Sequence, residues 1–197
     1  MKRVLVAYAT HTGSTAEVAA AIAEELATSA VQVEVRPMAA VPSIDGYDAV
    51  VVGGPMILGW HRQARAFLRR HRKQLGRIPF AVFVMAMSLT ETAERDIDGS
   101  VVVVDDRLPK PPHREHHLSF KERYARLPNY VGPILRSVRP ALPRSIGMFG
   151  GRLEYGRLKW YAVLFVMVFL KVPAGDRRNW EAIRSWAASL RASLELG

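Results

Sequence analysis

Short apolar runs bounded by turn residues recur along this chain and alternate with segments of helical spacing. Three segments have apolar residues at every third or fourth position, which predicts amphipathic helices. These segments are Ser14–Ser29, Gln63–Gln74 and Asn179–Leu194. The apolar runs predict five strands, most of them buried: Val4–Ala9, Val31–Val35, Ala49–Val52, Phe80–Met87 and Ile146–Phe149.

The alternation of strand and helix predicts right-handed crossovers and therefore a parallel sheet. We expect an α/β fold with a doubly wound five-stranded sheet of order 2-1-3-4-5, in a single domain over residues 1–197. In such a sheet, ligands bind beyond the carboxyl ends of the strands, where the strand order reverses. Three loops fall at that edge: Thr10–Thr15, Gly53–His61 and the loop that starts at Met87-Ser88.

A long insertion, residues 88–145, separates the fourth and fifth predicted strands. Val101–Val104 predicts a short extra strand, and Ser119–Leu127 predicts one or two helical turns. Elsewhere the density of prolines opposes a continuous helix. These prolines are Pro109, Pro111, Pro112, Pro128, Pro133, Pro140 and Pro143. We expect this insertion to lie beside the ligand crevice and to select the substrate, without building the crevice itself.

The composition removes several classes of chemistry. There is no cysteine, which excludes disulfides, thiolate metal sites and cysteine nucleophiles. The N-terminus enters a strand almost at once, so we expect no signal peptide and a cytoplasmic protein. Three histidines gather in the insertion, at His113, His116 and His117, but without a recognised ligand spacing, so no metal site is predicted.

The positive charge is concentrated in one part of the chain. Of the formal net charge of +10, residues 107–159 carry twelve Lys/Arg against three Asp/Glu. A patch of this sign attracts anionic lipid, a carboxylate-bearing ligand, an acidic protein or nucleic acid. Aromatic residues are not interleaved with the basic ones as in a nucleic-acid motif, which argues against nucleic acid. The alternative is an arginine-rich, solvated surface.

The first of the three loops has the chemistry of a phosphate site. It lies between the first strand and the first helix, where unpaired backbone N–H groups and the helix dipole favour an anion. It lacks the lysine of a nucleoside-triphosphate loop and the several glycines of a dinucleotide loop. It therefore suits one phosphate monoester, and the alternative is an ordinary helix cap. The residues are Thr10, His11, Thr12, Gly13, Ser14 and Thr15.

This loop resembles the T-x-T-G-x-T phosphate loop of flavodoxins, which binds the phosphate of FMN. The likeness covers about residues 1–87 and 146–196. The segments Gly53–His61, Gly150–Tyr155 and Arg157–Tyr161 resemble, more narrowly, the flavodoxin-fold quinone-dependent protoporphyrinogen dehydrogenases of the HemG type. The resemblance implies a fold of flavodoxin type, FMN as the cofactor, and oxidation of protoporphyrinogen with a quinone acceptor.

The second and third loops supply the expected flavin-ring site, since large side chains suit the ring faces and backbone groups suit its edge. For Trp60 the alternative is a core aromatic, and for His61 it is the start of a helix. The third loop has no aromatic residue, which leaves a ring face open for a substrate unless Trp60 or the insertion covers it. The predicted residues are Gly54, Pro55, Met56, Ile57, Leu58, Gly59, Trp60, Met87, Ser88 and Leu89. No catalytic side chain is nominated.

Trp160–Leu170 is an uninterrupted apolar run with basic flanks. It is too short to span a bilayer, so it predicts contact with the inner face of the cell membrane, and the alternative is a buried core element. Membrane contact suits a quinone acceptor. Two other functions stay open: a soluble flavodoxin-type electron carrier, and a non-catalytic flavin-fold protein that binds an anionic partner through its basic insertion. The sequence leaves the oligomeric state open.

Overall fold

The computed structural model describes residues 1–57, 59–90, 96–112, 117–153 and 175–196. The apolar run Trp160–Leu170 and the histidines His113 and His116 lie outside these residues, so the expectations attached to them stay predictions. Within the described residues, no helix has the length and apolar character needed to cross a membrane.

The main sheet has seven strands in the order β2-β1-β3-β4-β7-β6-β5. All neighbouring pairs are parallel except β5 and β6, which are antiparallel. The bounds are β1 Lys2–Tyr8, β2 Val31–Pro37, β3 Ala49–Pro55, β4 Phe80–Ala86, β5 Asp96–Ile97, β6 Ser100–Val104 and β7 Ser145–Gly150. The five predicted strands are β1, β2, β3, β4 and β7 in the predicted order, which confirms the doubly wound fold. The insertion adds β6, as predicted from Val101–Val104, and the short β5.

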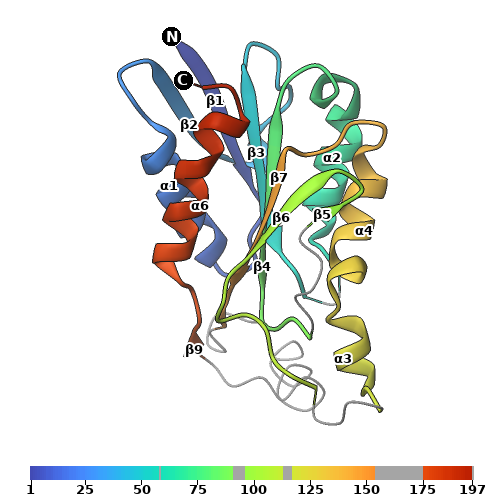
Figure 1. Ribbon diagram of the computed structural model, residues 1–197. Helices are drawn as coiled ribbons and strands as arrows, with labels where there is room; N and C mark the ends of the chain where they lie inside the picture. The colour runs from blue at the N-terminus through green and yellow to red at the C-terminus, as the bar shows by residue number, and fades with distance from the viewer. Residues whose placement is uncertain (58, 91–95, 113–116, 154–174, 197) are drawn as a thin grey trace.

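Helices cover both faces of this sheet (Figure 1). On one face, α1 (Ser14–Leu26) packs against α6 (Trp180–Ser193), and on the other, α2 (Arg62–Leu75) packs against α4 (Leu127–Val138). Each face has its own buried apolar cluster, and every residue of β4 and β7 is buried between them. Short helical segments complete the fold: the 3-10 turn η1 (Met38–Ala40) and the helix α3 (Phe120–Tyr124).

The helix α4 corrects the prediction that prolines keep the insertion from forming a continuous helix. Pro128 lies in its first turn, where the missing N–H is not needed, and Pro133 lies inside it. An internal proline costs about 3 kcal/mol. Four aliphatic side chains of α4 are nearly or fully buried, and each contributes about 1.5–3 kcal/mol. Burial therefore outweighs the cost of the proline. These side chains are Val131, Ile134, Leu135 and Val138.

Candidate functional site

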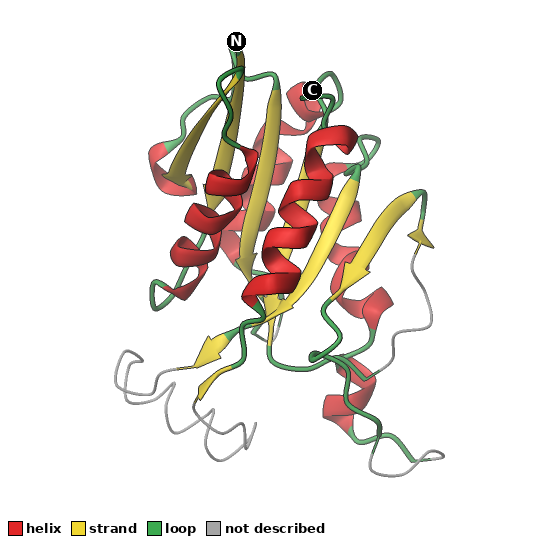
Figure 2. Ribbon diagram, turned by 60° about the vertical axis from the view of Figure 1, so that its left-hand side comes forward, coloured by secondary structure: helices red, strands yellow, loops and turns green. Residues whose placement is uncertain are grey.

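The three predicted loops meet at one end of the sheet, where the carboxyl ends of β1, β3 and β4 lie together (Figure 2). The second loop is tied to β4 through the Met56 N–H, which donates to the Met85 carbonyl at 2.8 Å. The first and second loops touch through His11 and His61, whose ring centroids are 4.4 Å apart. The three loops that the topology predicts at one edge are therefore brought together from segments far apart in the sequence.

The first loop has the backbone geometry of an anion site. Gly13 stands at the N-cap of α1 with φ 93°, and its N–H donates to the Thr10 hydroxyl oxygen at 2.9 Å. Among the described residues, no side chain caps the first turn of α1. The Ala16 N–H donates to the Gly13 carbonyl at 2.9 Å, so among the described residues the N–H groups of Ser14 and Thr15 are the ones that this turn leaves unpaired, an arrangement that favours an anion. Thr12 and Ser14 are partly exposed, whereas Thr15 is 1% exposed and belongs to the interior.

The pKa values of the two histidines at this point are lowered, which favours the neutral form of each ring. Burial lowers the pKa of His11, and burial together with the neighbouring His11 lowers the pKa of His61. The Nδ1 atom of His61 accepts a hydrogen bond from the Gln63 N–H at 3.2 Å, so His61 caps the start of α2. The alternative that His61 begins a helix is therefore the observed arrangement, and its remaining ring proton is on Nε2.

The second loop contributes less accessible surface than the sequence indicated. Trp60 is 3% exposed, and its indole N–H donates to the Gly54 carbonyl at 3.2 Å. Met56 is also buried, so both side chains are core residues and neither is available as a wall of an open crevice. Ile57 is 37% exposed, and Gly59 adopts a φ of +119°. Of the described residues of this loop, Ile57 is exposed, and Pro55, Gly59 and His61 are partly exposed. Leu58 lies outside the described residues.

The glycine pair before this loop belongs to β3 rather than to the loop. A Cβ on Gly53 would lie 1.9 Å from the ring of Phe83, and one on Gly54 would lie 3.3 Å from the Cβ of Ala64. Gly53 therefore makes room for an aromatic ring on β4, and Gly54 allows α2 to pack close to the sheet. Neither role was expected from the sequence, which assigned these glycines to backbone approach toward a ligand. Pro55, which follows, is the partly buried last residue of β3.

The insertion supports the third loop, contrary to the expectation that it only lies beside the crevice. The Leu89 N–H donates to the Leu108 carbonyl at 3.2 Å, and the Thr90 N–H donates to the Ala125 carbonyl at 2.7 Å. The Thr90 hydroxyl donates to the Glu122 carbonyl at 2.8 Å. Leu89 is fully buried, so only Met87 and Ser88 of the predicted residues are partly exposed here.

Two tyrosines of the insertion also reach the loops, and no sequence pattern singled them out. The Tyr130 hydroxyl donates to the Ser88 carbonyl at 3.3 Å, and the ring centroids of Tyr124 and Tyr130 are 6.0 Å apart. A Cβ on Gly59 would lie 3.6 Å from the Tyr124 hydroxyl oxygen, so Tyr124 adjoins the second loop. Burial, followed by the neighbouring Tyr124, raises the pKa of Tyr130 to about 12, which keeps this phenol neutral.

A buried arginine fixes the start of α1 beside the first loop. Arg178 has a side chain 3% exposed, and it pairs at 2.6 Å with both Glu17 of α1 and Asp176. Its guanidinium lies 4.5 Å from the ring centroid of Trp180. Hydrogen bonds and ion pairs with Asp176 and Glu17 raise the pKa of Arg178 despite its burial. Asp176 and Trp180 are each two residues from Arg178, but Glu17 is far away in sequence, so no spacing along the chain could have predicted its part in this cluster.

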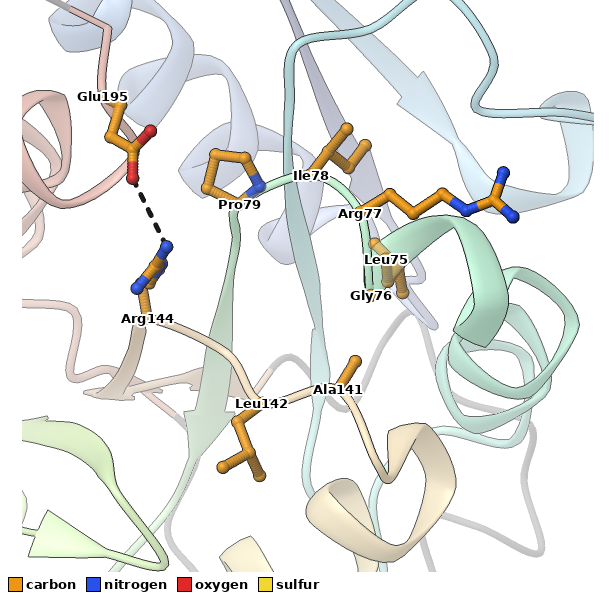
Figure 3. A pocket seen from close by; sticks show the side chains of 9 residues that line it. All are labelled: Leu75, Gly76, Arg77, Ile78, Pro79, Ala141, Leu142, Arg144 and Glu195. Atoms are coloured by element: carbon orange, nitrogen blue, oxygen red, sulfur yellow. Dashed lines mark hydrogen bonds and ion pairs between the residues drawn. The ribbon is translucent and has the colours of Figure 1, made fainter.

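Hollows elsewhere on the surface do not coincide with these loops. A pocket of about 250 Å³ lies at the opposite end of the sheet, where β4 and β7 begin, and contains the ion pair Arg144–Glu195 (Figure 3). Its lining residues are Leu75, Gly76, Arg77, Ile78, Pro79, Ala141, Leu142, Arg144 and Glu195. A groove of about 840 Å³ runs between β6 and α6, with Val101 and Val103 on one wall and Trp186 on the other.

Known proteins with a similar sequence or structure match this fold. Residues 5–178 match the flavodoxin domain family model. Over 95% of its length the chain is 22% identical to protoporphyrinogen IX dehydrogenase [quinone] of Escherichia coli K12, of which 94% is covered.

Two solved structures are similar at lower identity. The first is the flavodoxin, WrbA-like protein of Agrobacterium tumefaciens, with 13% identity over all of this chain and 99% of that one and a TM-score of 0.48. The second is a K13G mutant flavodoxin of Fusobacterium nucleatum bound to flavin mononucleotide. It has 19% identity over 44% of this chain and 52% of that one, with a TM-score of 0.34. With the family model matched over most of its length, this chain belongs to the flavodoxin domain family.

Proposed function

We propose that this protein is an FMN-dependent oxidoreductase that oxidises protoporphyrinogen and passes the electrons to a quinone. The observation that carries the proposal is the full-length likeness to the E. coli dehydrogenase, which extends over 95% of this chain and therefore includes most of the insertion. A likeness confined to the sheet would fit any flavodoxin. Here the insertion is also bonded to the loop that borders the crevice, as at Thr90 and Tyr130.

The proposed cofactor site uses the residues that the structure leaves accessible. The backbone N–H groups at the start of α1, with Thr10, Thr12 and Gly13, would hold the FMN phosphate. Ile57 and Gly59 of the second loop and Met87 of the third would border the ring. The bound flavin supplies the two-electron redox chemistry, and the chain's residues bind and orient it. Trp60 and Leu89 act from the core by fixing the shape of the two loops.

The third loop favours an enzyme over an electron carrier. Met87 and Ser88 are partly exposed, and no aromatic side chain from Met87–Thr90 is present to stack on a ring face. A substrate that passes hydride to a flavin needs access to that face. Tyr130 holds the Ser88 carbonyl at 3.3 Å and keeps this opening in a defined shape. The third loop would thus leave one ring face accessible to a substrate while its own backbone is held in place.

The proposal is tested with purified protein under anaerobic conditions, by measuring bound flavin and turnover of protoporphyrinogen with menadione. We expect Thr12→Glu to lose FMN, because the new carboxylate would face the phosphate. Thr28→Glu, an exposed position beyond the far end of α1, should retain FMN and serves as the matched control. Protein that binds FMN and accepts electrons from a flavodoxin reductase, but turns over no porphyrinogen, would establish the carrier alternative instead.

We also propose that the protein works at a membrane surface, where quinones dissolve. The support is the apolar run Trp160–Leu170 and its basic flanks, together with the net charge of +10. Co-sedimentation with vesicles of anionic lipid should be strong at low salt and weaker, but not abolished, at high salt. Absence of binding at low salt would favour the core interpretation of the run and a soluble electron acceptor.

A further inference from the structure

We propose that Lys110 and Arg177 form a binding site for a carboxylate group of the reducing substrate, at the edge of the third loop. This inference rests on the proposed function, in which the substrate is an apolar macrocycle with two carboxylates. Neither residue was singled out by the sequence, where each is one of many basic residues. The two are brought together only by the fold.

Both residues are attached to the third loop by hydrogen bonds to its backbone carbonyls. The Lys110 N–H donates to the Leu89 carbonyl at 2.7 Å, next to a parallel bridge between Leu89 and Pro109. On the other side, the Arg177 Nη1 donates to the Met87 carbonyl at 3.3 Å. Alternate residues of the loop, Met87 and Leu89, thus hold one basic residue each.

The backbone of Arg177 is fixed as well. Its N–H donates to the Gly151 carbonyl at 3.1 Å. A Cβ on Gly150 would lie 2.1 Å from the Arg177 carbonyl oxygen, so only glycine allows the two segments to approach this closely. This contact follows the antiparallel pairing of β8 (Arg152–Leu153) with β9 (Gly175–Asp176). The backbone of Arg177 is therefore held in place by these contacts with Gly150 and Gly151.

The structure shows no carboxylate partner for this pair among the residues that it describes. Burial, and then the positive charge of Arg177, lower the pKa of Lys110. Among the described residues, no carboxylate forms an ion pair with either side chain. The contrast with the next residue is sharp, because Arg178 is paired with both Glu17 and Asp176 at 2.6 Å. Of two consecutive arginines, Arg178 is paired with two carboxylates, whereas within the described part of the chain the charged neighbour of Arg177 is the cation Lys110.

Two adjacent, uncompensated cations favour an anion, and a carboxylate can bind a guanidinium in a bidentate manner. The site is joined to Met87, whose side chain is partly exposed at the crevice. A ligand held here by a carboxylate would therefore place an apolar body against the open side of the third loop. That is the arrangement a dicarboxylic macrocycle requires in order to stack over a flavin.

The test compares protoporphyrinogen with its dimethyl ester, which keeps the macrocycle and removes the charge. In Lys110→Ala and Arg177→Gln we expect the KM for the diacid to rise about tenfold, as the loss of one charge-assisted contact implies, with kcat nearly unchanged. The KM for the ester and the Kd for FMN should stay as in the wild type. Lys110→Arg should restore most of the lost affinity. Arg136→Ala, an exposed basic residue of α4, is the matched control.

A binding titration with the oxidised porphyrin, protoporphyrin, separates this site from the proposed activity. If the wild type turns over no porphyrinogen, the proposed function fails. The carboxylate site still stands if protoporphyrin binds more tightly than its dimethyl ester and Lys110→Ala removes the difference. Equal affinity for acid and ester in the wild type would overturn the site. So would an equal loss in Lys110→Ala and Arg136→Ala, even with full turnover.

Discussion

Gly13 offers a direct test of the phosphate-loop geometry. Its φ of 93° lies in the region that side chains disfavour, and the strain for a non-glycine residue there is about 1–2 kcal/mol. In Gly13→Ala this strain either lowers the free energy of unfolding or drives the loop into another conformation. The second route breaks the 2.9 Å bond from Gly13 to Thr10 and turns the N–H groups of the α1 start away from the ligand.

Two measurements are therefore needed. One is urea unfolding of the FMN-free protein, and the other is a fluorescence titration with FMN. We expect the decrease in the free energy of unfolding and the decrease in the free energy of FMN binding to sum to about 1–2 kcal/mol. This corresponds to a factor of about 5–30 in an equilibrium constant. Gly132→Ala makes the same chemical change inside α4, where alanine favours the helix and the nearest atom, 3.2 Å away, is the flexible end of Arg136. That variant should be neutral or more stable, with unchanged FMN affinity. A Gly13→Ala protein with wild-type stability and wild-type affinity would refute the loop geometry.

Three further predictions concern the support of the site. Trp60→Phe should leave the quenching of bound flavin unchanged, because the indole is 3% exposed, and Trp60→Ala should cost about 3–5 kcal/mol in urea unfolding. Loss of quenching in the phenylalanine variant would show that the indole stacks on the flavin. Thr90→Val should lower the free energy of unfolding by about 1 kcal/mol, since it removes the 2.8 Å bond to the Glu122 carbonyl, whereas Thr28→Val, which loses an exposed 3.2 Å bond from the Ala30 N–H, should lower it less. Burial lowers the pKa of His71, so the unfolded chain takes up a proton that the fold excludes as the pH falls below about 6.5. Stability should therefore decline toward acid pH by up to about 1.4 kcal/mol per pH unit from this residue, and urea unfolding of His71→Leu should show a shallower decline. Parallel pH profiles for the two proteins would contradict this assignment.

The elements that local pattern determines were predictable from the sequence. The strands β1, β3 and β4 are unbroken apolar runs because both of their faces are buried, and a run of that kind can be recognised without knowing its neighbours. The order of the five strands was expected from the doubly wound fold that the alternation of strand and helix predicts. The first loop could also be placed between β1 and α1, because the strand, the loop and the helix are consecutive in the chain, and its binding of a phosphate stays a prediction.

What could not be predicted depends on contacts between distant segments. Trp60 is an aromatic residue of the kind that stacks on flavin rings, and only the packing of α2 on β3 shows that its side chain faces the core. Pro133 predicts a break that the burial of α4 against α2 overrides. Arg177 and Arg178 are adjacent and identical in type. Their opposite environments come from Glu17 on one side and the third loop on the other, and neither is close in sequence.

The position of β6 in the sheet has a consequence for synthesis. β6 pairs with β5, which precedes it, and with β7, which begins more than forty residues later, so its main partner does not yet exist when it is made. At about 5–20 residues per second, the Val101–Val104 run waits roughly 2–10 s on the ribosome before Ser145–Gly150 can follow. During that time four consecutive valines, a sequence prone to intermolecular pairing, have only the two-residue β5 as a partner in the sheet. The brevity of β5 limits what the finished edge can recruit, and until β7 arrives the opposite edge of β6 lacks the strand that pairs with it in the finished sheet.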